Sequence, residues 1–157
     1  MNRISTAVLI LFCSLMIFVG CNGQKRPAGM PKLYPVTLTI TQANAPLVDA
    51  VVSVIPEEAC QWSGGGTTDA NGKLELYTQG QYKGIPLGKY KVTVSKEIIE
   101  NPQMKESDPP GKRFSVIDSV CGTRETTPLQ IDVNESTKEF TLDVGKAVKR
   151  RCKQLKR

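Results

Sequence analysis

Cysteine is the side chain with the most reactive chemistry in this sequence of 157 residues, because the chain has no histidine. A Ser-His-Asp triad, a Cys-His pair and a His-containing zinc site are excluded by that composition. A zinc site built from cysteine alone favours paired C-x-x-C spacing, which none of the five cysteines shows. We therefore expect no catalytic residue, no metal and no cofactor, and the chain is not expected to be an enzyme.

Three cysteines, Cys60, Cys121 and Cys152, lie beyond the N-terminal region, so they cannot all pair within one molecule. A disulfide between Cys60 and Cys121 is one interpretation, since both lie in loop-like stretches. In the chain-entropy model, closing a loop of that size is worth about 4 kcal/mol. Cys152 would then be a thiol near the C-terminus that could link two copies into a dimer. Three unpaired thiols are the other interpretation, and both stay open.

Asp69, Asn71 and Glu75 bring oxygen ligands close together in the sequence. A calcium loop needs more oxygens and a distal bidentate acid, so these three residues do not make one. Asp69-Ala70-Asn71-Gly72 has the residue types of a β-turn, which is the interpretation we favour.

The basic character of the chain belongs to its two ends. Of the 21 Lys and Arg residues, seven lie in 146–157, three in 21–32 and one in 1–20, which leaves 10 against 15 acidic residues in 33–145. A nucleic-acid-binding domain would show basic residues across a folded face, so we expect no nucleic-acid partner. The basic tail, 146–157, is either a contact for anionic lipid or polyanions, or a solvated charged end.

The N-terminus has the organisation of an export signal. Residues 7–19 are almost wholly apolar, but they are too few to cross a hydrocarbon core of about 30 Å. Phe18-Val19-Gly20-Cys21 resembles a lipobox, the motif of bacterial lipoproteins at which a cysteine thiol receives lipid and the chain is cleaved before it. The resemblance implies a signal peptide at 1–20 and lipidation (such as palmitate) of Cys21. The composition of 21–32, with Gly23, Pro27 and other breakers among polar residues, predicts a flexible linker.

Alternating apolar and polar residues predict strands from Leu33 onward. Six strands are expected, and a seventh around 114–120. Gly64-Gly65-Gly66 is expected to be a turn, and Glu135-Ser136-Thr137 the loop of a hairpin. The expected helix is confined to the tail, where Val148, Cys152 and Leu155 fall on one helical face. The six segments are 36–41, 48–55, 73–77, 90–94, 129–133 and 140–144.

Three motifs in this region, at 44–52, 66–76 and 85–94, resemble those of carboxypeptidase regulatory-like, transthyretin-like domains; the second begins Gly66-Thr67-Thr68-Asp69-Ala70-Asn71-Gly72. A fourth segment, 125–133, is similar to the closing strands of planctomycete-type lipoproteins that carry this domain. The resemblance implies an all-β, seven-stranded, Ig-like or transthyretin-like sandwich over 33–145, and a non-enzymatic binding role.

Loops at the ends of such a sandwich often carry binding residues. We expect the loops 60–66, 79–84 and 98–113 to face a partner, with Trp62 and Tyr82 as candidate contacts for a carbohydrate or an envelope protein. Capping the edge of the core is the favoured alternative for both side chains, since large aromatic residues are mostly buried.

Together these patterns predict a lipoprotein of the bacterial cell envelope that acts as a surface or periplasmic binding or scaffolding module. The alternative is an envelope spacer whose basic tail engages anionic lipid or a polyanion. Asn22 after the lipidated cysteine favours the outer membrane or the periplasmic face, by analogy with the family.

Overall fold

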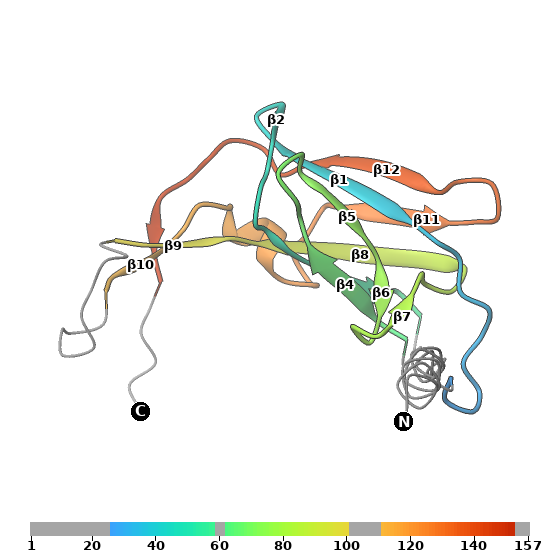
Figure 1. Ribbon diagram of the computed structural model, residues 1–157. Coiled ribbons are helices and arrows are strands. Elements are labelled where there is room, and N and C mark those ends of the chain that lie inside the picture. Colours follow the sequence, from blue (N-terminus) through green and yellow to red (C-terminus); the bar gives the residue numbers. More distant parts are fainter. Residues whose placement is uncertain (1–25, 59–61, 101–110, 153–157) are drawn as a thin grey trace, which may run out of the picture.

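The computed structural model describes residues 26–58, 62–100 and 111–152, and these residues form an all-β structure (Figure 1). Two sheets pack face to face as a sandwich, and a third, smaller sheet projects from one end of it. The all-β fold class predicted from the alternating pattern is therefore confirmed.

The first sheet is organised around β1 (Thr37–Gln42). Strand β12 (Glu139–Asp143) pairs with it in parallel on one side, in the register Thr37↔Glu139 to Thr41↔Asp143. On the other side β1 pairs antiparallel with both β2 (Ala45–Pro46) and β5 (Lys73–Glu75).

The second sheet has the strand order β11-β8-β3-β4-β6-β7, and all its pairs are antiparallel. Its strands are β3 (Val51–Pro56), β4 (Gly64–Thr67), β6 (Tyr77–Thr78), β7 (Tyr82–Lys83), β8 (Gly88–Ser95) and β11 (Gln130–Val133).

The core lies between these two sheets because every second residue of their strands points inward. Leu38 and Ile40 on β1 are fully buried, as are Val92 on β8 and Val54 on β3. The buried hydroxyls are bonded as well: Thr68 donates to the Leu47 carbonyl at 2.6 Å and accepts from the Ala50 N–H at 2.8 Å.

The structure has more and shorter strands than the seven expected, because extended segments change sheets along their length. The segment 73–78 pairs with β1 before Leu76 and with β4 after it. At the crossover, the Leu76 N–H donates to the Val36 carbonyl and the Leu76 carbonyl accepts from the Gly84 N–H. Leu76 itself is fully buried and joins the two sheets.

The triple glycine is a strand and not the turn that its composition suggested. Gly64-Gly65-Gly66 belongs to β4 and pairs with β3. A Cβ on Gly64 would lie 2.9 Å from the Ile85 side chain and from the Tyr77 carbonyl oxygen. The glycines are needed because β4 passes so close to its neighbours, which is a packing requirement that resembles a turn signal in the sequence.

The predicted hairpin at 135–137 is also wrong. Strands β11 and β12 do not pair with each other, because the connection crosses from the second sheet to the first. Asn134 shapes the crossing: its Oδ1 accepts from the N–H groups of Ser136 and Thr137, at 3.0 and 2.8 Å.

A third sheet, which we call the arm, consists of three short strands in the order β13-β10-β9. They are β9 (Glu97–Ile99), β10 (Arg113–Ser115) and β13 (Arg150–Arg151). Strand β9 continues β8 after a break at Lys96, and Figure 1 shows the arm projecting at the end of the long β8 ribbon. The helix expected in the tail is not found in its described part, where residues 150–151 are extended and pair with β10.

The short helix η1 (Ser119–Gly122) is a 3₁₀ turn between the arm and β11, where part of a seventh strand was expected. Asp118 caps its first turn by accepting from the Val120 N–H at 3.1 Å. In the described ranges, no helix is long and apolar enough to cross a membrane.

Candidate functional site

The cysteines predicted to carry chemistry lie in very different surroundings. Cys21 and Cys60 fall outside the described residues, so lipidation and the Cys60–Cys121 disulfide both stay predictions. Cys121 is a buried free thiol in the core. Burial, and then the nearby Asp118 carboxylate, raise the pKa of Cys121. A thiol with a raised pKa is a poor nucleophile at neutral pH, because the thiolate is the reactive form.

Trp62 is only 7% exposed, so its ring packs against the protein and is not offered to a partner in this structure. Tyr82 is half-buried in β7. The core-capping role favoured for these aromatic residues fits Trp62, and the loops that were expected to present them are partly strands.

Asp69 makes a β-turn. Its Oδ1 accepts from the N–H groups of Asn71 and Lys73, each at 2.8 Å, and Gly72 follows with a φ of +71°. That oxygen is occupied by the turn, and no group of three metal-binding side chains is found among the described residues.

Two shallow open hollows mark the six-stranded sheet. One, of about 360 Å³, is lined by residues that include Gly64–Gly66 of β4 and Val51 and Ser53 of β3. The other, of about 350 Å³, lies at the end of β8 and is lined by Glu57, Glu58 and Asp132 beside the exposed Leu87. Neither hollow holds a nucleophile next to a base.

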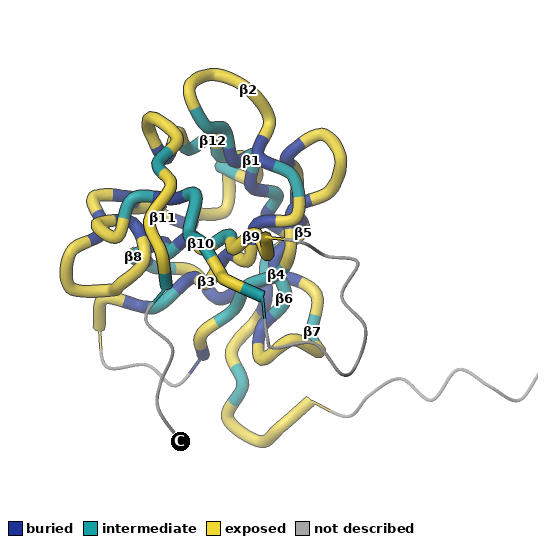
Figure 2. The backbone as a smooth tube through the Cα atoms, turned by 90° about the vertical axis from the view of Figure 1, so that its left-hand side faces the viewer, coloured by how far each residue is buried: buried dark blue, intermediate teal, exposed yellow. Residues whose placement is uncertain are grey.

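The arm is the region where apolar and cationic side chains gather without a second sheet of described residues packed on them. Ile98 is 39% exposed and Ile99 is 49% exposed, and they point to opposite faces of the same sheet. All three residues of β9 are exposed, whereas the strands of the sandwich alternate between buried residues and exposed or intermediate ones (Figure 2).

Six cations lie on or next to the three arm strands, against the two acids Glu97 and Glu100. The cations are Lys96, Lys112, Arg113, Lys149, Arg150 and Arg151. Since three of them come from the C-terminal tail, pairing of β13 with β10 converts part of the predicted basic tail into an ordered basic surface.

Hydrogen bonds to the sandwich hold the base of the arm. The Val116 N–H donates to the Lys96 carbonyl, and the Val148 N–H donates to the Val116 carbonyl, both at 3.1 Å. Gln42 of β1 donates its side-chain amide to the same Val116 carbonyl at 2.9 Å. The arm is therefore fixed where it leaves the sandwich, although its strands are short.

Cys152 lies beside β13 and is half-buried. Its thiol donates to the Glu97 carboxylate at 3.5 Å. Partial burial and then this carboxylate raise the pKa of Cys152. The predicted dimer through Cys152 stays a prediction, and the thiol is held by its own chain and not in a free tail.

Sequence reasoning found the tail cations but missed their partners in the arm. The segments 97–99, 113–115 and 150–151 are distant in the chain, and each is too short to show a periodic pattern. The sequence signal for the arm was the adjacent pair Ile98-Ile99 in the expected loop 98–113. Two large apolar residues next to each other in an exposed loop indicate a contact surface.

Comparison with known proteins adds little at this level of similarity. No family model matches the chain, and no curated protein matches it significantly. Among solved structures, a crystal structure of a 9R-lipoxygenase from Cyanothece PCC8801 matches with a TM-score of 0.33 and 15% identity. The match covers 92% of this chain but only 20% of that chain, and it carries no argument about fold or activity.

Proposed function

We propose that this chain is a non-enzymatic bacterial lipoprotein, anchored through lipid on Cys21, whose β-sandwich is a binding or scaffolding module at the cell envelope. The observation that carries the proposal is the Phe18-Val19-Gly20-Cys21 motif after a short apolar segment. The order of elements along the chain supports it: the described linker residues are largely exposed, and the buried core begins only at Leu33.

A non-enzymatic role is supported by the chemistry of the side chains present. The chain has no histidine, and burial raises the pKa of the Cys121 thiol, which disfavours the reactive thiolate. The hydroxyls of Thr68, Thr78 and Thr127 are buried, and each one donates to a backbone carbonyl. These groups therefore serve the fold.

Metabolic labelling with an alkyne fatty acid tests the anchor. We expect the wild-type chain to incorporate the label and to fractionate with membranes, and Cys21→Ala to lose both properties. Cys13→Ala is the matched control, because it removes a thiol from the apolar segment eight residues earlier and should keep both. Labelling of Cys21→Ala equal to that of the wild type would contradict the proposal.

The arm favours a second candidate function, an envelope spacer that engages anionic lipid or a polyanion. Its support is the ordered set of cations around β10 and β13. Binding of this kind falls as salt is raised, because exposed charges are screened beyond about 10 Å at 0.1 M ionic strength. Binding to a glycan or envelope-protein array that persists at high salt would favour the first function instead.

A further inference from the structure

The two faces of the arm differ in how their charges are used. Residues opposite each other in an antiparallel pair share a face, and residues two apart along a strand share it too. Ile98, Phe114 and Arg151 are opposite one another across the three strands. We call their side of the sheet the cationic face; its residues are Ile98, Glu100, Lys112, Phe114, Lys149 and Arg151.

On the opposite face, the cations contact side chains of the protein itself. Arg113 lies 3.7 Å from the Glu97 carboxylate, and Arg150 donates to the Ser119 hydroxyl at 2.6 Å. Cys152 contacts Glu97 as well. Little positive charge is left for a partner on this side.

The cationic face keeps its charge available. Lys112 and Arg151 make no ion pair with a described residue, and the single acid, Glu100, lies 4.0 Å from the Lys149 ammonium. That ammonium also lies 4.6 Å from the centre of the Phe114 ring, which fixes it at the edge of the apolar residues. Ile98 and Phe114 are thus bordered by three cations and one acid.

We propose that the cationic face of the arm docks on the anionic headgroups of a lipid bilayer. The face has net positive charge around an exposed apolar side chain, and this combination suits the boundary between headgroups and acyl chains. The proposal rests on the proposed function in one respect: a lipid on Cys21 would hold the face near the bilayer at all times.

Because the lipid on Cys21 would tether the chain to the bilayer, a weak contact between the arm and the headgroups is sufficient for docking. Each Lys or Arg near an anionic surface contributes roughly fivefold in affinity, so three cations opposed by one acid give about thirtyfold. The linker from Cys21 to Lys32 can span at most about 40 Å, which keeps the arm at a high effective concentration beside the membrane.

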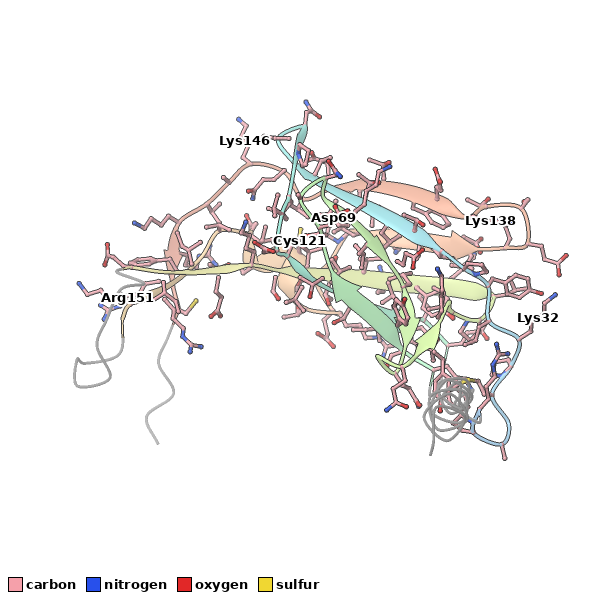
Figure 3. All side chains as sticks on the ribbon, viewed as in Figure 1. Lys32, Asp69, Cys121, Lys138, Lys146 and Arg151 are labelled. Carbon is pink, nitrogen blue, oxygen red and sulfur yellow. The ribbon has the colours of Figure 1, made fainter. Side chains whose placement is uncertain are left out.

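The geometry also gives an orientation. Lys32, at the end of the linker, and Arg151, in the arm, lie at opposite ends of the molecule (Figure 3). A molecule held at both ends would lie with its long axis along the membrane plane, and not upright on its linker.

The test is sedimentation of the full chain carrying Cys21→Ser with vesicles, so that binding does not depend on the lipid anchor. We expect binding to mixed phosphatidylglycerol–phosphatidylethanolamine vesicles and much weaker binding to phosphatidylcholine vesicles. The latter also report any contribution of the apolar residues 1–20. Lys112→Gln with Arg151→Gln should weaken binding to the anionic vesicles about thirtyfold, at fivefold for each charge.

The matched control is Lys32→Gln with Lys138→Gln, the same change of charge at the other end of the molecule (Figure 3). It should lose far less affinity, and an equal loss would overturn the docking face because only net charge would matter. Ile98→Asn should weaken binding without changing charge. Tighter binding to soluble polyphosphate than to anionic vesicles would overturn the bilayer as the ligand.

Failure of this proposal and failure of the lipid anchor give different results. If the arm variants bind vesicles like the parent while Cys21 still incorporates the fatty-acid label, the arm proposal alone is wrong. If Cys21 takes no label while the arm variants weaken vesicle binding, the anchor alone is wrong. Thermal unfolding of each variant checks that the exposed substitutions leave the fold intact.

Discussion

The sandwich and the arm are both built from β-strands, but they bury very different amounts of apolar surface. In the sandwich, Leu38 and Val92 are fully buried between two sheets. In the arm, Ile98 and Ile99 lie on opposite faces of a sheet that no other sheet of the described residues covers, and both are exposed. Stability should therefore reside in the sandwich, and the exposed part of the arm should contribute little to it.

The arm nevertheless forms because its base belongs to the sandwich. Ile117, two residues after β10, is 2% exposed and part of the core. Lys96, between β8 and β9, donates its ammonium to the Val48 carbonyl at 2.7 Å. Well-packed residues at its base can hold a sheet that could not stand alone, since isolated short strands are marginal in water.

The largest expected effect on stability comes from truncating one apolar residue in the sandwich and comparing it with the same kind of truncation in the arm. Leu38→Ala removes a fully buried side chain and should cost about 2–5 kcal/mol of unfolding free energy. Ile99→Ala removes a side chain that is 49% exposed and should cost under about 0.5 kcal/mol. Urea unfolding followed by circular dichroism measures both, and similar losses would contradict the division between sandwich and arm.

A second test concerns the turn that closes β5 onto the sandwich. Gly72 has a φ of +71°, and a Cβ there would lie 2.6 Å from the Ile40 carbonyl oxygen. Gly72→Ala should therefore cost about 3 kcal/mol, from backbone strain and the clash together.

Gly80→Ala separates these two causes. Its φ is +69°, but no atom lies within 4 Å of the Cβ position, so only the strain of about 1–2 kcal/mol is expected. Equal losses for the two variants would show that the close approach of Gly72 to β1 costs nothing.

A third test compares hydroxyl hydrogen bonds in the two regions. Thr68→Val leaves the Ala50 N–H without its partner in the core and should cost about 1–2 kcal/mol. Ser115→Ala in the arm removes a half-buried hydroxyl that donates to the Ile117 carbonyl, and water can replace it, so we expect about 0.5 kcal/mol. Thermal unfolding would show the order, and a larger loss for Ser115→Ala would be evidence against an exposed arm.

The smallest expected effect is a dependence of stability on pH, caused by the Asp143 carboxylate at the edge of the sandwich. The Asp143 carboxylate accepts from the N–H groups of Asn44 and Gly145 and from the Thr41 hydroxyl, which lowers the pKa of Asp143 below its usual 3.8. A lowered pKa stabilises the fold fully above 3.8, and the contribution is lost as the pH falls below it. Asp143→Asn should flatten this loss in denaturant midpoints measured across that range, and an unchanged pH dependence would contradict it.

The alternating segments were predictable because a strand with one buried face has a period of two residues. Val36-Thr37-Leu38-Thr39-Ile40-Thr41 shows that period without a break, and β1 lies there. Pairing was not predictable from the same signal. The spacing between β11 and β12 fits a hairpin, but a loop of that length can also cross to the other sheet. Asn134 and its neighbours form such a crossing.

The arm was the least predictable region, since its order depends on contacts between distant segments. Arg150 and Arg151 are extended because β10 offers them backbone partners, and nothing within the tail specifies that. Val148 and Cys152 have helical spacing, yet the same two residues donate their N–H groups to the carbonyls of Val116 and Arg113. Local periodicity is a weak guide where a neighbouring edge strand can capture a short segment.

The parallel pair of β1 and β12 also bears on how the chain folds. Thr41 and Asp143 are hydrogen-bonded at 2.9 Å although they are 102 positions apart. The first strand of the sandwich, β1, therefore pairs with a strand that lies near the end of the chain. Contacts of such long sequence separation slow folding, because a large loop must close before they form. The edge of β1 therefore stays open until nearly the whole chain is present, and a chain still emerging through Leu129 would expose that edge to other unfolded copies.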